Sequence, residues 1–257
     1  MGLEIKKLYK RFQSNAMNTL EDVNLDISDG EFICVTGPSG CGKTTLLNLI
    51  AGLETPTSGE LLLDGDKITK PGHDRVVMFQ ESALFPWLSV SQNVKFGLKL
   101  AGKSKGEQED IAMHYLQMVQ LAHFKDYRCH ELSGGMKQRV ALARALALES
   151  KILLMDEPFA SLDKQTTNML RDEIQDIWAK TKKTVLFITH SIEEAVFFAD
   201  RIVLLSANPG KIVSVTNVTL QRPRHIEDPA FIELRAELLK QIKKEVERKV
   251  GSEYDNG

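Results

Sequence analysis

The sequence has few cysteines and no long apolar run, and each absence excludes some classes of protein. Its three cysteines, Cys34, Cys41 and Cys129, neither form an even set for disulfides nor have the spacing of metal ligands. No stretch approaches the roughly 18 consecutive apolar residues of a membrane-spanning helix. The first residues, MGLEIKKLYK, lack the apolar core of a signal peptide. The expected location is therefore the cytosol.

An excess of basic residues is also missing. Lys and Arg total 33 against 35 Asp and Glu, which gives a formal net charge of -2. Nucleic-acid-binding proteins usually carry a basic surplus or stripe, so this balance argues against a nucleic-acid partner. The phosphates of a nucleotide need only local positive charge. With 257 residues, 42% of them hydrophobic, the composition is typical of a globular protein that buries a large core.

Short apolar runs alternate with helical segments over much of the chain. The runs expected to form strands are EFICVT, GELLLDG, RVVMFQ, KILLMD, TVLFIT and RIVLLS. Several are apolar throughout, as is typical of strands covered on both faces. Helices are expected at 134–149, at 164–180 and in KTTLLNLIAGL, which ends near Gly52. This alternation indicates an α/β fold with a largely parallel sheet.

Two segments depart from the alternation. Between Leu84 and Leu148 almost no β-like run occurs, which we interpret as a mostly helical insertion between two strands of the sheet. Further on, apolar residues at 231, 234, 238, 239, 242, 246 and 250 fit one amphipathic helix. Glutamates are interspersed with its lysines, which favours packing against its own domain over binding to a membrane surface.

The stretch GPSGCGKTT matches the phosphate-binding pattern G-x-x-x-x-G-K-S/T and lies between an expected strand and an expected helix. Its glycines at 37, 40 and 42 let the backbone curl so that successive N–H groups point at phosphate oxygens. The helix that follows presents its positive end to the same anion. Lys43 is expected to reach the β- and γ-phosphates, and the Thr44 hydroxyl to bind Mg²⁺. Cys41 is most simply a small residue that fits the loop, although a thiol near a helix N-terminus can be acidified and become redox-sensitive.

Two acids follow the apolar run in KILLMDEP. Asp156, at the end of an expected strand, can hold Mg²⁺ beside a P-loop, and Glu157 can polarise a water against the γ-phosphate. Two acids at a strand end can also be mere surface charges. In a chain that contains a P-loop, they indicate ATP hydrolysis.

LSGGMKQR followed by KILLMDEP resembles the signature and adjoining strand of ABC transporter ATPases, and the motifs of that family occur in order along nearly the whole chain. The resemblance implies a P-loop NTPase with a RecA-like, mostly parallel sheet core, an N-terminal antiparallel β subdomain and an inserted α-helical subdomain. It implies a single domain over 1–257. The core would occupy 1–83 and 150–225, the helical subdomain 84–149, and a C-terminal helix 226–250.

The resemblance also implies roles for individual residues. Gln80 matches the Q-loop, and His190 matches the switch histidine that holds the γ-phosphate. Phe12 falls where the family places an aromatic residue that stacks on adenine, with Tyr9 as the alternative. Ser161, Leu162 and Asp163 match the D-loop. Taken singly, Gln80, His190 and Phe12 would be an ordinary loop residue, a hydrogen-bonded histidine and a core residue, and it is their joint order that argues for function.

The implied site residues fall into three sets. The catalytic residues would be Glu157, His190 and Gln80, and the metal ligands Thr44, Gln80 and Asp156. The nucleotide-binding residues would be Phe12, Gly37, Pro38, Ser39, Gly40, Cys41, Gly42, Lys43, Thr44, Thr45, Ser133, Gly134, Gly135 and Asp163.

In this family two ATPase chains associate head to tail, and each ATP lies between the P-loop of one chain and the LSGG of the other. The physical chemistry agrees, because a second helix start offers the γ-phosphate further N–H donors. The resemblance thus implies ATP and Mg²⁺ as cofactors and a second ATPase subunit, expected to be an identical copy. It also implies integral membrane permease subunits, an indirect periplasmic or extracellular solute-binding protein, and a position at the cytoplasmic face of the cell membrane.

ESALFPWLSVSQNV and THSIEEAVFFADRIVLLSANPGKI are similar to the importer branch for nitrate, sulfonate, taurine and related small solutes. Importers for other solutes, such as a thiamine precursor, look alike here, so the solute and the direction of transport stay open. We expect the region of Phe85, Pro86 and Trp87 to dock the permease, with a buried structural Trp87 as the alternative. Ser191 follows His190 where Asp is frequent, and serine can cap the next helix equally well.

Other ATPase classes fit less well. A non-transport ABC-type ATPase of DNA repair would separate its halves by long coiled coils, and no sustained heptads occur here. A translation-associated ABC protein would normally carry two ATPase units in one chain. A P-loop kinase would not explain LSGG beside KILLMDEP.

Overall fold

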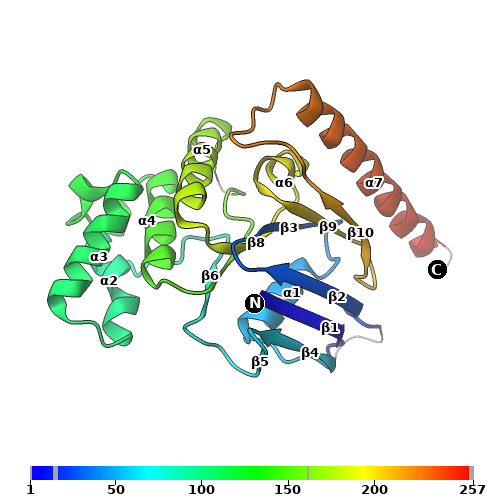
Figure 1. The fold of residues 1–257 in the computed structure, drawn as a ribbon, viewed down its shortest axis with the longest axis horizontal. Coiled ribbons are helices and arrows are strands. Elements are labelled where there is room, and N and C mark those ends of the chain that lie inside the picture. The colour runs from blue at the N-terminus through cyan, green and yellow to red at the C-terminus, as the bar shows by residue number, and fades with distance from the viewer. Residues whose placement is uncertain (1, 14–16, 161, 255–257) are drawn as a thin grey trace. The chain divides into compact units, whose positions relative to one another are not determined.

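The computed structural model describes residues 2–13, 17–160 and 162–254, with side chains up to residue 248. The chain divides into two compact units (Figure 1). The first consists of Met1–Gly72 and Thr184–Gly257, and the second of His73–Lys183. Among the described residues, no helix is both long and apolar enough to cross a membrane.

An antiparallel sheet forms part of the first unit. It consists of β1 (Gly2–Lys10), β2 (Leu20–Ser28), β4 (Ser58–Leu63) and β5 (Asp66–Lys67), in the order β2-β1-β4-β5. Every second residue of β2 from Val23 onwards is buried, as expected of a sheet with one covered face. This sheet is the N-terminal β subdomain that the family resemblance implies.

The first unit also contains three parallel strands, of which β3 directly precedes the glycine-rich loop. β3 (Phe32–Thr36) lies between β8 (Thr184–Ile188) and β9 (Arg201–Leu205) and is parallel to both, and β10 (Ile212–Asn217) pairs antiparallel with β9. All residues of β3 and β8 are buried, which explains why both runs are apolar except for the threonines Thr36 and Thr184. Helix α1 (Lys43–Ala51) follows β3 and ends as expected at Gly52, whose φ of 75° a glycine adopts without strain.

Helix α7 (Pro229–Tyr254) contacts α6 (Ile192–Phe198) in the first unit. Phe231 and Leu238 are buried, whereas Ile232, Leu239 and Val246 are 44%, 49% and 41% exposed. The helix therefore packs against its own unit, as expected, although Leu239 and Val246 of the apolar stripe are exposed.

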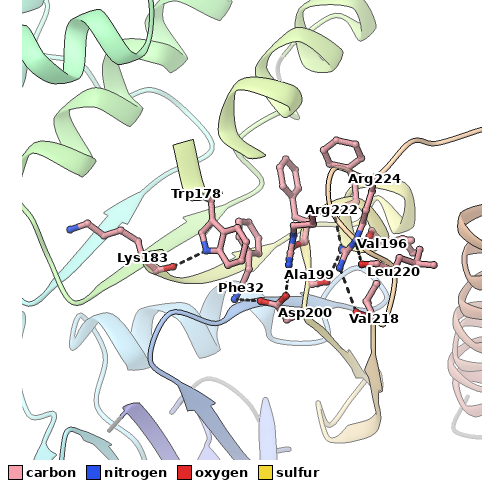
Figure 2. A network of polar contacts seen from close by, with 12 residues as sticks. Phe32, Trp178, Lys183, Val196, Ala199, Asp200, Val218, Leu220, Arg222 and Arg224 are labelled. Carbon is pink, nitrogen blue, oxygen red and sulfur yellow. Dashed lines mark hydrogen bonds and ion pairs between the residues drawn. The ribbon is translucent and has the colours of Figure 1, made fainter. Parts of the chain in front are cut away.

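Two arginines fix the segment that leads into α7 (Figure 2). Arg224 is 3% exposed, and its Nη1 lies 2.7–3.1 Å from the carbonyl oxygens of Val196, Phe197 and Ala199 at the end of α6. Arg222 pairs with Asp200, which also accepts a hydrogen bond of 2.9 Å from the backbone N–H of Phe32. Because the last carbonyls of a helix have no partner within it, a buried cation at this position stabilises the end of α6.

The second unit contains β6 (Arg75–Met78), which pairs parallel with β7 (Ile152–Asp156), and several helices. The helices are α2 (Val90–Leu100), α3 (Lys105–Met118), α4 (Gly134–Ala147) and α5 (Lys164–Thr181), with short 3₁₀ turns at Ala122–Phe124 and Cys129–Glu131. Capping boxes at Ser89 and Ser104 start α2 and α3. Within 84–149 the structure shows helices, turns and one isolated bridge, and no strand.

Candidate functional site

The GPSGCGKT loop joins the buried strand β3 to helix α1 in the first unit. Gly40 and Gly42 have φ angles of 79° and 93°, in the left-handed region that side chains rarely adopt. Lys43 is 8% exposed, and its Nζ donates to the carbonyl oxygens of Gly37 at 3.1 Å and Pro38 at 3.3 Å. The ammonium group is therefore held over the loop at the positive end of α1, which suits a bound polyphosphate.

Cys41 lies inside this loop and is fully buried. Its Sγ lies 3.9 Å from Nζ of Lys43. Burial raises the pKa of the Cys41 thiol, although the nearby Lys43 opposes that rise. Burial therefore argues against an acidified thiol and favours the simpler interpretation, in which Cys41 is a small residue that fits the loop.

Phe12 follows β1 in the same unit and is half-buried. The Nζ of Lys10 lies 4.6 Å from the centroid of the Phe12 ring. The backbone beside the ring is also fixed, because the N–H of Arg11 donates to Oγ1 of Thr57 at 2.9 Å.

His190 is exposed and lies between β8 and α6, directly before Ser191, the N-cap of α6. Ser191 caps α6, since its side chain accepts a hydrogen bond from the N–H of Glu194, so the predicted capping role is confirmed. Oγ1 of Thr189 accepts from the N–H of Ser191 at 2.9 Å and donates to the carboxylate of Glu194 at 2.5 Å. These bonds fix the backbone on both sides of His190.

The two acids lie in the second unit, where Asp156 is the last residue of β7 and Glu157 is the next residue. Both are half-buried. Glu157 has a φ of 45°, which is uncommon for a residue with a side chain. Strained backbone of this kind is concentrated at functional sites, because the surrounding structure must hold it in place.

The second glycine-rich helix start also lies in the second unit. Ser133 is exposed and caps α4, since its side chain accepts from the N–H of Met136 at 3.3 Å. A Cβ on Gly135 would lie 2.4 Å from Cγ2 of Thr166, so only glycine lets α4 approach the start of α5.

Asp163 caps α5 in the same region. Its carboxylate accepts from the N–H of Thr166 at 3.0 Å and from the hydroxyl of the same residue at 2.7 Å, and these bonds lower the pKa of Asp163. Capping is a structural reason for an aspartate here, besides the role that the D-loop resemblance implies. Ser161, the other polar residue of that motif, lies outside the described residues.

The segment 79–88, here termed the Gln80 loop, is attached to helix α4 by contacts that the sequence did not predict. Nε2 of Gln138 donates to the carbonyl oxygen of Gln80 at 2.8 Å. Nη1 and Nη2 of Arg144 donate to the carbonyl oxygens of Ala83 and Ser82 at 2.8 and 3.0 Å. Because the acceptors are backbone atoms, which every residue has, no sequence pattern could have indicated these contacts. The helix that starts with the signature therefore also positions the Gln80 loop.

Of the aromatic residues in the Gln80 loop, Phe79 and Trp87 are exposed and Phe85 is half-buried. Trp87 is 68% exposed, so the alternative of a buried structural tryptophan is wrong. The ring centroid of Phe85 lies 4.4 Å from the ring centroid of Phe96 and 5.5 Å from that of Trp87. The buried side chain of Asn93 holds the Phe85 backbone, since its Oδ1 accepts from the Phe85 N–H at 2.8 Å and its Nδ2 donates to the Phe85 carbonyl at 3.2 Å. Together with Leu100, 75% exposed, these rings form an apolar surface.

The expected site residues are thus distributed over both units. The first unit carries Phe12, the P-loop from Gly37 to Thr45, and His190, and the second carries Gln80, Ser133, Gly134, Gly135, Asp156, Glu157 and Asp163. Among the described residues, no group of three or more His, Cys, Asp or Glu could hold a metal ion. Thr44 in the first turn of α1 and Asp156 at the end of β7 offer the oxygen atoms that Mg²⁺ prefers beside phosphates.

A glycine-rich loop between a buried parallel strand and a helix, with two acids at the end of another parallel strand, defines the class of P-loop ATPases. Residues 20–160 match the ABC transporter family. The nitrate import ATP-binding protein of a Synechocystis strain is 49% identical over 89% of this chain and 86% of its own length. The taurine import ATP-binding protein of Pseudomonas entomophila is 43% identical over 93% of this chain and 96% of its own. A dimeric ATP-binding cassette in a post-hydrolysis state bound to ADP and Pi has a TM-score of 0.73 and 31% identity over 85% of this chain and 100% of its own.

The chain belongs to the ABC transporter family. The family and the fold class predicted from the sequence are therefore confirmed, together with the class of enzyme, an ATP hydrolase of the ABC type.

Proposed function

We propose that this protein is the ATP-hydrolysing subunit of an importer for a small anionic solute of the nitrate, sulfonate or taurine type. The observation that carries the proposal is the P-loop itself, with Lys43 held over a glycine-rich loop at the start of α1. The identity to a nitrate and a taurine import protein supports the choice of solute. The subunit acts at the cytoplasmic face of the cell membrane, bound there by permease subunits.

The residues of the chain divide the chemistry of hydrolysis among them. The loop N–H groups and Lys43 bind the phosphates and neutralise the charge that develops on them. Glu157 orients the attacking water and takes up its proton, and His190 holds the γ-phosphate. Thr44, Gln80 and Asp156 are the residues that would hold Mg²⁺, which supplies charge neutralisation when bound.

The signature completes the site in a second copy of the chain. Ser133, Gly134 and Gly135 form a helix start whose N–H groups and positive end can bind a γ-phosphate. Because one chain already has a P-loop for its own nucleotide, the second helix start is proposed to bind the ATP of the partner. ATP then closes the dimer, hydrolysis reopens it, and Asp163 crosses the interface.

The apolar surface on the Gln80 loop is the proposed docking site for the permease. Exposed aromatic rings on a loop that Asn93 and Arg144 hold in place are typical anchors of protein interfaces. Trp87→Ala should abolish assembly with the permease while the ATPase stays folded. Leu239→Ala provides a control at an exposed apolar residue of α7. Normal assembly and transport with folded Trp87→Ala would contradict the docking role.

Solute uptake in a deletion strain tests the proposal as a whole. The strain carries either the wild-type protein or Lys43→Ala, and the uptake of nitrate, taurine and an aliphatic sulfonate is measured one solute at a time. The ATPase activity of the purified complex is measured for the same two proteins. Uptake of one anion that depends on Lys43 would support the proposal. ATPase activity without uptake of any of these anions would contradict the assigned solute class. Failure to co-purify with a multi-span permease would contradict the transport role.

A further inference from the structure

We infer that Lys10 is a positioning residue for nucleotide binding, which orients the ring of Phe12 and fixes it relative to the P-loop helix. The inference rests on the adenine-stacking role of Phe12 in the proposed function. All residues that carry it lie in the first unit.

Lys10 is unusual because its charged group is buried. It is 7% exposed at the end of β1, and burying an ammonium group is costly unless it is paired and hydrogen-bonded. Its Nζ pairs with Oε2 of Glu54 at 2.8 Å and donates to the carbonyl oxygen of Thr55 at 2.8 Å. The same Nζ lies 4.6 Å from the centroid of the Phe12 ring. One ammonium group thus binds an acid, a backbone carbonyl and an aromatic face.

The contact with the ring determines which face can bind a base. A cation over an aromatic face is attracted by the negative potential of that face. With the ammonium group on one side, a base can stack only on the opposite side. Because the cation also draws electron density away from that opposite face, it favours stacking with an electron-rich purine.

The contact with Glu54 links the ring to the phosphate end of the site. The backbone N–H groups of Leu53 and Glu54 donate to the carbonyl oxygen of Asn48, within α1, at 2.9 and 3.2 Å. Helix α1 begins at Lys43, directly after the glycine-rich loop. Through Lys10 the ring is therefore attached to the helix that binds the phosphates. Since the covalent structure of a nucleotide limits the distance between its base and its phosphates, this attachment prepares both sites for one ligand.

Binding measurements with ATP and with inorganic tripolyphosphate test the inference, because tripolyphosphate has no base. In Lys10→Met, which keeps a long apolar side chain, ATP should bind about three- to tenfold more weakly, the size expected for loss of a cation–ring contact. The affinity for tripolyphosphate should stay within about twofold. Lys10→Arg should restore most of the ATP affinity. Lys6→Met is the matched control, because Lys6 lies on the same strand with a half-exposed ion pair to Glu4.

A double substitution separates orientation of the ring from stability of the fold. In a Phe12→Ala background, Lys10→Met should weaken ATP binding no further, because the ring that it orients is absent. If Lys10→Met fails to fold, Glu54→Gln provides the second variant, and it should lower ATP affinity relative to tripolyphosphate affinity by a smaller factor.

Three outcomes would overturn the inference. If Lys10→Met weakened the affinities for ATP and for tripolyphosphate by the same factor, Lys10 would only maintain the fold. The ratio of ATP affinity to tripolyphosphate affinity could also stay unchanged in Lys10→Met but fall in Phe12→Ala. This result would remove the role of Lys10 and leave the proposed function intact. An unchanged ratio in Phe12→Ala itself would contradict the adenine-stacking role and the inference with it.

Discussion

Replacement of Arg224 should destabilise the first unit more than replacement of any exposed cation. Arg224→Met keeps most of the side-chain volume but leaves buried carbonyl oxygens at Val196, Phe197 and Ala199 without their donor. Hydrogen bonds from a charged donor contribute about 1.5–3 kcal/mol each, and here one nitrogen atom is shared among three acceptors. With the unsatisfied helix end included, the free energy of unfolding should fall by about 3–5 kcal/mol.

Urea unfolding followed by circular dichroism, together with hydrogen exchange of the α6 amides, provides the assay. Arg222→Met is a graded comparison, because Arg222 is 21% exposed and its ion pair with Asp200 should be worth only about 1–2 kcal/mol. Lys243→Met, at a side chain that is 79% exposed, should change the free energy by less than about 0.5 kcal/mol. A loss in Arg224→Met no greater than that in Arg222→Met would refute the reasoning.

The same prediction has a pH component. Burial, followed by repulsion from Arg222, lowers the pKa of Arg224 to about 10. Since this folded-state pKa lies below that of an arginine in the unfolded chain, the two states bind different numbers of protons only above about pH 10. The difference in unfolding free energy between wild type and Arg224→Met should therefore be constant from about pH 6 to pH 9. A difference that shrinks within this range would indicate another titrating group.

Three further predictions concern the site. Glu157→Gln should still bind ATP but hydrolyse it about 100-fold or more slowly, so that a closed dimer accumulates and is detected by size-exclusion chromatography. Normal turnover in this variant would refute the role of Glu157. Arg144→Met should speed hydrogen exchange in the Gln80 loop more than Arg128→Met does, because Arg144 donates to two loop carbonyls, those of Ser82 and Ala83, whereas Arg128 donates to the carbonyl of Trp87. Equal exchange rates in the two variants would contradict this. Because burial raises the pKa of Cys41, alkylation of the native protein should be much slower at pH 7 than that of the urea-unfolded chain and should accelerate as pH rises. Rapid alkylation of Cys41 at pH 7 would contradict its burial.

The sequence was sufficient to predict those parts of the fold that follow from local patterns. The strands β3 and β8 were predictable because every residue in them is buried, and all but Thr36 and Thr184 are apolar. The P-loop was predictable because its backbone requires glycines at fixed positions. The acids after β7 were predictable because a strand end is a recurrent place for metal-binding carboxylates.

Features that depend on contacts between distant segments were not predictable. The buried contacts of Arg224, Gln138 and Arg144 go to backbone carbonyls, which are present at every position. The exposure of Leu239 and Val246 on α7 was not predictable either, because apolar periodicity shows that a helix is amphipathic but does not show how much of its apolar surface the protein covers. The positive φ of Glu157 was not predictable, because glutamate, unlike glycine, does not indicate such a backbone conformation.

The first unit is assembled from the two ends of the chain, and this has a consequence for its synthesis. Strand β3 is hydrogen-bonded on both sides to β8 and β9, and the bond from the N–H of Gly30 to Oγ1 of Thr184 joins residues 154 positions apart. While the ribosome adds the residues between them, β3 is an apolar strand with two unpaired edges, which is the kind of segment that aggregates or is bound by chaperones. We therefore expect the glycine-rich loop that follows β3 to reach its folded conformation only after β8 and β9 have been synthesised.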